Sequence, residues 1–163
     1  MANWCFNRVV FAGEAEAIEG VKRLFRQMAA TAEEDNCGQL PDFIKEDKGY
    51  FFEICVDDSA YCGICRYKTK WTPNVSAVQA IARRYGLDFT LDYAETGCLI
   101  YGRASQKDDI LSDVYLEDSD FEAYEYDEEN QLWLFEGKSC ESDSGILKVL
   151  LDRKINNQIN LLK

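Results

Sequence analysis

The sequence contains no histidine at any of its 163 positions. Histidine is the commonest general base, the commonest metal ligand and the side chain that titrates near neutral pH. Its absence excludes a Ser-His-Asp or Cys-His catalytic group within this chain. It also excludes a zinc site that mixes cysteine with histidine ligands. We therefore assign no catalytic residue, no metal site and no cofactor, and the sequence favours a protein that is not an enzyme.

Long apolar runs are also missing. The opening segment MANWCFNRVVFAGEAE has no basic start and no extended apolar stretch, so it does not resemble a signal peptide. No segment approaches the roughly 18 apolar residues that a membrane helix needs. We expect a soluble, cytoplasmic protein with no membrane contact. In that reducing compartment its seven cysteines, an odd number, are expected to be free thiols.

Basic residues are scarce in the second part of the chain. Residues 1–104 hold 12 basic and 15 acidic side chains, whereas residues 105–163 hold 6 and 15, and the whole chain has a net charge of −12. Between Asp108 and Glu129 there are 11 acidic residues and no basic one. Such a surface repels phosphate backbones, so we expect no direct binding of nucleic acid.

What the sequence does contain is a globular pattern of strands and helices, with 47% hydrophobic residues. Strand patterns alternate with helix patterns in the order β-α-β-β-α-β, which is the ferredoxin-like plan of an antiparallel sheet with both helices on one face. The expected strands are about Cys5–Phe11, Tyr50–Val56, Tyr61–Trp71 and Leu87–Tyr93, and the expected helices are about Glu14–Ala32 and the segment between Thr72 and Gly86.

The ends of the second helix carry specific signals. Thr72 suits the N-cap, Pro73 the first helical position and Gly86 the position just past the end. The strand that follows alternates strictly, so Leu87 to Tyr93 should present every second side chain to the core.

The remainder of the chain adds to this unit. Cys98–Ala104 reads as one more strand, Phe121–Tyr126 and Gln131–Glu136 as a hairpin, and Ser142 or Asp143 as the cap of a last helix. That helix carries an apolar stripe that needs a surface to cover it, formed by Leu147, Leu151, Ile155, Ile159 and Leu162. We expect a ferredoxin-like domain over 1–104 and an acidic hairpin with a C-terminal helix over 105–163, packed on the same unit.

Several short motifs occur in a familiar order. They are Asn3-Trp4-Cys5-Phe6-Asn7, Gly13, Thr69-Lys70-Trp71-Thr72-Pro73, Tyr93-Ala94-Glu95-Thr96-Gly97 and Tyr101-Gly102. Over residues 1–104 the chain resembles the YubB-type ferredoxin-like domain, a family of uncharacterised proteins encoded on bacterial plasmids, phages and related mobile elements. The resemblance implies the fold and a bacterial, mobile-element origin, and it implies no reaction. Asn74 stands where the family pattern often has a second proline.

Two motifs favour structural interpretations. Cys62-Gly63-Ile64-Cys65 lies in a predicted strand, where residues three apart point to opposite faces, so buried inert thiols are favoured over a metal or redox site. Arg66, Lys68 and Lys70 form a basic row that could bind phosphate. Pairing of this row with acidic residues of neighbouring strands, Glu53, Asp88 and Asp92, is the favoured alternative.

Two groups of residues are candidate binding sites. Strand-end residues that could line a small pocket are Asn3, Trp4, Trp71, Tyr93 and Glu95, although a structural cluster is the alternative. The candidate acidic surface comprises Glu117, Asp118, Asp120, Glu122, Glu125, Asp127, Glu128 and Glu129. Aromatic residues interleave with these acids, as on a protein-binding face, although plain solvation of a hairpin is the alternative.

The function that this pattern favours is that of a non-enzymatic interaction protein whose acidic surface binds a protein partner with a basic surface. One form of it is a DNA-mimic inhibitor of a nucleic-acid-binding protein. The alternative is a small enzyme or ligand-binding protein with a pocket at Trp4, Trp71, Tyr93 and Glu95. The sequence carries no signal for an oligomeric state.

Overall fold

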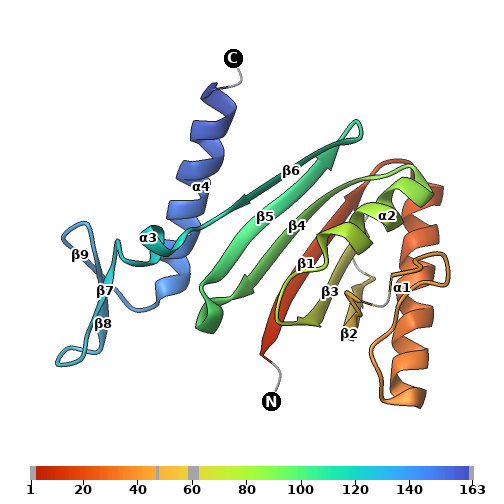
Figure 1. Cartoon of the computed structure of the whole chain (residues 1–163), viewed down its shortest axis with the longest axis horizontal. Helices are drawn as coiled ribbons and strands as arrows, with labels where there is room; N and C mark the ends of the chain where they lie inside the picture. The colour runs from red at the N-terminus through yellow and green to blue at the C-terminus, as the bar shows by residue number, and fades with distance from the viewer. Residues whose placement is uncertain (1–2, 47, 59–62, 162–163) are drawn as a thin grey trace.

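The computed structural model describes residues 3–46, 48–58 and 63–161, and within them it confirms the α+β, ferredoxin-like fold (Figure 1). The main sheet has six strands in the order β2-β3-β1-β4-β5-β6, and every neighbouring pair is antiparallel. These strands are β1 (Trp4–Ala12), β2 (Phe52–Asp57), β3 (Gly63–Lys70), β4 (Asp88–Glu95), β5 (Ile100–Lys107) and β6 (Ile110–Tyr115).

Helices α1 (Ala15–Asp35) and α2 (Val75–Tyr85) cover one face of the sheet. The predicted stripe of α1 is buried at Ile18, Val21, Phe25 and Met28. Alternate residues of β1, β3 and β4 complete the core from the sheet side, as in the fully buried Val9, Cys65 and Leu91. The alternation predicted for β4 is confirmed, because Phe89, Leu91 and Tyr93 are all buried.

The start of α2 differs from the prediction. Helix α2 begins at Val75 with Asn74 as its N-cap, not at Thr72-Pro73. Asn74 is buried; its Nδ2 donates to the Gly49 carbonyl, and its Oδ1 accepts from the Tyr67 hydroxyl, each at 2.8 Å. This side chain connects the start of α2 to β3 and to the loop that precedes β2. The predicted stop is confirmed, since Gly86 takes the left-handed conformation with φ 65°.

Beyond β4 the sheet is wider than predicted. A short 3-10 turn, η1 (Thr96–Cys98), leads to β5, and β6 follows through a turn at Asp108-Asp109. Strand β6 was absent from the sequence prediction. At the opposite edge, β2 has an irregular register between Phe52 and Cys55, and Glu53 there has φ 47°.

Residues 116–161 build a lobe and a helix. We call residues 117–140 the acidic lobe. It contains α3 (Asp118–Phe121) and a three-stranded sheet of β7 (Glu125–Asp127), β8 (Leu132–Phe135) and β9 (Lys138–Cys140). The predicted hairpin is thus a three-stranded sheet, and Phe121 lies in a helix instead of a strand because Glu117 and Asp120 form a capping box around that turn.

Helix α4 (Asp143–Leu161) packs on the face of the sheet opposite to α1 and α2. Its Leu147 and Leu151 are buried against Val114 of β6 and Leu116. Val114 is paired with Arg103, whose side chain lies on the face that α1 and α2 leave open. The apolar stripe continues past the sheet, because Ile159 is 48% exposed, and Leu162 lies outside the described residues. No helix in the described part of the chain is both long enough and apolar enough to cross a membrane.

Candidate functional site

Asn3 and Glu95, two of the predicted pocket residues, meet at the η1 turn, and Trp71 is joined to Asn3 through the backbone. The Asn3 Nδ2 donates to the Cys98 Sγ at 3.0 Å, and the Asn3 carbonyl accepts from the Trp71 backbone N–H at 2.9 Å. The Glu95 carboxylate accepts the Cys98 backbone N–H and so caps η1. These contacts connect the start of β1 with the ends of β3 and β4. Glu95 therefore works as a turn cap, which is the structural alternative stated for it.

The two aromatic residues Trp4 and Tyr93 lie on opposite faces of the sheet. Trp4 packs edge-on against Phe52, with ring centres 5.1 Å apart, and lines a cavity of about 480 Å³ at the β2 edge of the sheet, where that edge meets the C-terminal end of α1. Tyr93 is buried on the face of α1 and α2, and its hydroxyl donates to the Asp113 Oδ1 at 2.7 Å. Burial, followed by the bond to Asp113, raises the pKa of Tyr93, so this phenol stays protonated.

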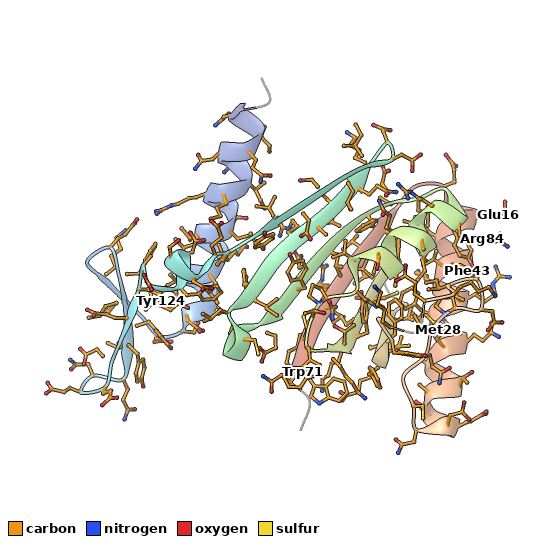
Figure 2. All side chains as sticks on the ribbon, viewed as in Figure 1. Glu16, Met28, Phe43, Trp71, Arg84 and Tyr124 are labelled. Atoms are coloured by element: carbon orange, nitrogen blue, oxygen red, sulfur yellow. The ribbon has the colours of Figure 1, made fainter. Side chains whose placement is uncertain are left out.

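Trp71 is half exposed at the end of β3, with φ 68° (Figure 2). Figure 2 also shows it well apart from Tyr124, a labelled aromatic residue of the acidic lobe. The five predicted pocket residues are therefore divided between the η1 turn, the two faces of the sheet and the exposed position that follows β3. The structure does not bring them together around one cavity.

The cysteine motif is only partly described. Cys62 lies outside the described residues, while Cys65 is fully buried in β3. Burial raises the pKa of the Cys65 thiol to about 12 and that of the Cys5 thiol to about 11. Among the described residues, no group of three or more acidic, cysteine or histidine side chains is arranged to hold a metal ion.

Thiol reactivity follows from these positions. A raised pKa lowers the thiolate fraction at any pH below it, and the thiolate is the reactive form. At pH 8 we expect iodoacetamide to alkylate the exposed Cys37, Cys55 and Cys98 well before Cys5 or Cys65. Peptide mass spectrometry over a time course measures the order. Labelling of Cys65 as fast as that of Cys37 in the folded protein would contradict the burial of β3, and denaturant should equalise the rates.

Three of the eight carboxylates of the predicted acidic surface have structural roles. Lys154 of α4 pairs with Glu117 and Asp120, at 2.7 and 2.6 Å. Asp127 holds the β7–β8 turn by accepting the backbone N–H groups of Glu129 and Asn130. The bonds from Asn130 lower the pKa of Asp127, so this carboxylate is charged at neutral pH. These residues fix the lobe and are not available to a partner without a structural change.

The other five carboxylates of the predicted surface are exposed. Their side chains make no hydrogen bond or ion pair with the part of the chain that the structure describes, and they are Asp118, Glu122, Glu125, Glu128 and Glu129. Tyr126, 47% exposed, lies among them on β7 and packs on Trp133 with ring centres 4.9 Å apart. The lobe thus presents unpaired negative charge around a supported aromatic side chain.

A groove of about 520 Å³ lies on the opposite face of the sheet from α1 and α2, bounded on one side by α4. We call it the open-face groove. Its wall includes Phe6 and Arg8 of β1, Arg66 and Lys68 of β3, Glu53 of β2, Asp92 and Ala94 of β4, Tyr101 and Arg103 of β5, and Lys148, Leu151 and Asp152 of α4.

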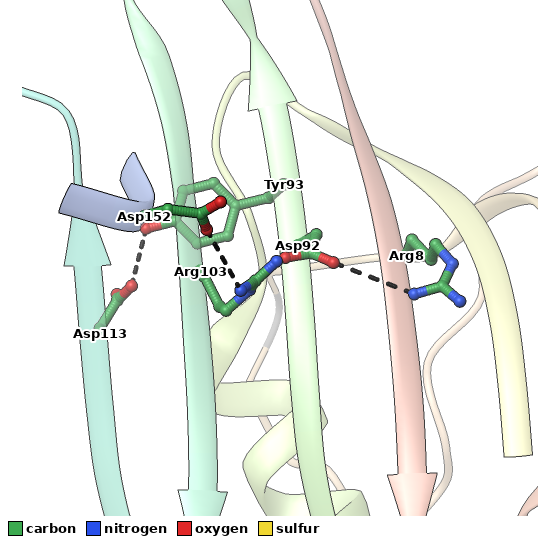
Figure 3. A network of polar contacts seen from close by, with 6 residues as sticks. All are labelled: Arg8, Asp92, Tyr93, Arg103, Asp113 and Asp152. Atoms are coloured by element: carbon green, nitrogen blue, oxygen red, sulfur yellow. Dashed lines mark hydrogen bonds and ion pairs between the residues drawn. The ribbon is translucent and has the colours of Figure 1, made fainter. Parts of the chain in front are cut away.

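A row of charges crosses this groove from β1 to α4 (Figure 3). Asp92 lies 3.9 Å from the Arg8 guanidinium and accepts from the Arg103 Nε at 2.6 Å. Arg103 also lies 3.9 Å from Asp152, so α4 is tied to the sheet through it. Each cation and anion of the row has an opposite charge beside it, and the side chains are one-third to one-half exposed.

One of the ion pairs predicted for the basic row of β3 is present. Lys68 pairs with Glu53, which confirms the predicted cross-strand contact, and Arg66 lies 4.0 Å from Asp57. Lys70 lies over the Phe52 ring, 5.0 Å from its centre. Asp88 is wrong as a partner, because its carboxylate accepts the backbone N–H of Asp108 at the far end of β4.

The sequence interpretation missed the groove because its wall comes from six separate elements. One signal was present: Phe6 stands between Cys5 and Asn7 in β1, so strict alternation places it on the face away from the core. Phe6 is 59% exposed, an unusual position for a large apolar side chain in a central strand. Lys148 and Asp152 could be placed there only once the position of α4 was known.

Comparison with known proteins gives a fold-level answer. Residues 49–136, more than half of the chain, match the family described as "Ferredoxin-like domain in Api92-like protein", and the match extends from just before β2 to the end of β8. No curated protein and no solved structure shows a significant match to this sequence.

Proposed function

Because the chain belongs to the family of ferredoxin-like domains in Api92-like proteins, a description that names a fold and no reaction, we propose that the protein is a non-enzymatic binding protein. In this proposal the acidic lobe docks on a basic surface of a protein partner. The observation that carries it is the set of five exposed carboxylates that pair with none of the residues the structure describes, placed on a lobe that other charges hold in position.

The lobe is held against α4 by three basic contacts, and this favours a docking surface over a flexible acidic tail. Lys154 pairs with Glu117 and Asp120, and the Arg153 guanidinium pairs with Glu136 at 2.6 Å and lies over the Phe135 ring. A preorganised charge pattern loses less conformational entropy on binding than a flexible one. Complementary charge also raises the rate of encounter with a basic partner.

The finer parts of the proposal rest on the sequence. Order and spacing of the motifs from Asn3 to Gly102 support a YubB-type domain of a bacterial mobile element, acting in the cytoplasm. A partner in that setting would be a basic nucleic-acid-binding protein, with the lobe replacing DNA phosphates on it. The alternative pocket at Trp4, Trp71, Tyr93 and Glu95 has less support, because Trp4 and Tyr93 lie on opposite faces and Glu95 caps η1.

The test compares two variants of equal net charge. The lobe variant carries D118N, E122Q, E125Q, E128Q and E129Q, which spare the structural carboxylates. The control variant carries E14Q, E16Q, E33Q, E34Q and D35N, five exposed acids in and beside α1. Affinity capture from a bacterial lysate at low salt should retain basic proteins on the wild type and the control, and the lobe variant should retain about tenfold less.

The identity of what is captured then decides between the forms of the proposal. A purified basic partner should bind the wild type less tightly as salt rises, because screening weakens exposed charge pairs. Duplex DNA should release that partner if the lobe acts as a DNA mimic. Equal capture by the lobe variant and the wild type would exclude the acidic lobe as the docking surface. If the control variant loses as much captured protein as the lobe variant, the effect comes from overall charge and not from the lobe.

A further inference from the structure

The open-face groove is a separate feature, and its local charge differs in sign from that of the molecule. Its wall carries five basic and three acidic side chains, an excess of two positive charges, whereas the whole chain has a net charge of −12. A cationic cleft of this kind on an anionic protein attracts small anions at short range. Its volume of about 520 Å³ is within the range of small-molecule sites.

Pairing within the wall shows which cations are available. The row from Arg8 to Asp152 is balanced internally, and Lys68 is paired with Glu53. Lys148 of α4 is exposed and has no ion-pair partner among the residues that the structure describes. Arg66 is 54% exposed, and within the described ranges its ion-pair partner is Asp57, at 4.0 Å. Arg66 lies on β3, whereas Lys148 lies on α4, which packs over β5 and β6 on the other side of the groove.

The aromatic character of the groove is equally specific. Phe6 exposes 59% of its surface, and its neighbours across the two adjacent strands are Lys68 and Ala94. The Lys68 ammonium lies 5.2 Å from the centre of the Phe6 ring. The small Ala94 leaves space on the β4 side. An exposed ring on a rigid strand is a platform on which a planar ligand stacks.

Tyr101 adds a neutral donor to the same wall. Burial, followed by the charge of Asp92, raises the pKa of its hydroxyl, and that hydroxyl makes no hydrogen bond with the described residues. A protonated phenol can donate a hydrogen bond to an anion.

We propose that the open-face groove binds a small planar anion, an aromatic ring system that carries a phosphate or a carboxylate group. The ring lies against Phe6, and Lys148 of α4 pairs with the negative group. A long polyanion is excluded from the same surface, because α4 forms one wall of the groove and the acidic lobe adjoins α4. This inference does not depend on the proposed function of the lobe.

Isothermal titration calorimetry with three probes tests the ligand class. AMP presents a ring and a phosphate, benzoate a ring and a carboxylate, and adenosine a ring without charge. We expect AMP or benzoate to bind at least about tenfold more tightly than adenosine, with affinity falling as salt rises. Binding of AMP alone assigns the phosphate, and binding of benzoate alone assigns the carboxylate. If neither binds at millimolar concentration, or if adenosine binds equally well, the proposal is overturned.

Four variants locate the site. F6A and K148M should each weaken the bound probe about tenfold. The controls I110A and K107M remove an exposed apolar or basic side chain outside the groove and should leave the affinity unchanged. If K107M weakens binding as much as K148M, the effect of K148M comes from net charge and not from the groove. If F6A binds the probe with full affinity, Phe6 is not the surface on which the ring stacks. F6A and K148M should not affect the capture of a basic partner by the acidic lobe. The groove proposal and the lobe proposal can therefore be tested independently.

Discussion

Replacing Phe25 with alanine is expected to lower the free energy of unfolding by about 3–5 kcal/mol. Phe25 is fully buried and joins α1 to the sheet. Its ring centre lies 5.9 Å from that of Phe11, 5.4 Å from that of Phe51 and 6.2 Å from that of Tyr67. Truncation removes the central ring of this cluster, and the rigid sheet behind it cannot close the cavity.

Urea denaturation followed by circular dichroism measures this loss. The matched control is Phe6→Ala, which removes the same ring from the exposed face of β1 and should change the free energy of unfolding by less than about 1 kcal/mol. Equal losses in the two variants would contradict the assignment of the core to the face of α1 and α2. A whole domain is stable by about 5–15 kcal/mol, so the Phe25 variant should also unfold at a visibly lower temperature.

Replacing Gly102 with alanine is the second large effect that we expect. A β carbon on Gly102 would lie 2.4 Å from the Tyr93 Oη and 2.5 Å from the ring carbon that bears it. Tyr93 crosses β5 at this glycine to reach Asp113 on β6. The added methyl group must displace the ring and break that bond, at a cost of about 1–3 kcal/mol.

A double-mutant cycle separates this clash from any general effect of alanine in a strand. In a Tyr93→Ala background the space above Gly102 is empty, so the same Gly102→Ala change should cost little. We expect the cycle to give a coupling energy of about 1–2 kcal/mol between the two positions. Additive losses would mean that Tyr93 does not lie over Gly102. Tyr93→Phe, which removes only the hydroxyl, should cost about 1 kcal/mol.

The regular parts of this fold were predictable because their burial is one-sided. Strand β4 alternates between core and open face, and α1 has a single buried stripe, so each leaves a period in the sequence. Strand β6 leaves none, because five of its six residues are exposed and only Val114 is buried. The sequence of an edge strand that is mostly exposed to solvent therefore shows the same polar pattern as an acidic loop.

The candidate sites were harder, since they depend on which strand ends meet. Tyr93 and Glu95 are two residues apart in β4, yet one is buried over Gly102 and the other caps η1. The sequence predicts the acidic residues only as a group, and the structure separates Glu117 and Asp120, which pair with Lys154, from the exposed Glu122. Phe6 and Lys148 become neighbours in one groove only through the packing of α4, a long-range contact that no local period records.

The two outer strands of the main sheet have a consequence for behaviour at high concentration. Unpaired strand backbones invite other chains to add to a sheet. Strand β2 is distorted at Glu53, and β6 is short, is preceded by Asp108 and Asp109, and contains Asp113. A bulge at one rim and like-charge repulsion at the other both oppose edge-to-edge aggregation, so the exposed Ile110 and Leu111 of β6 do not by themselves make this protein a seed for amyloid growth.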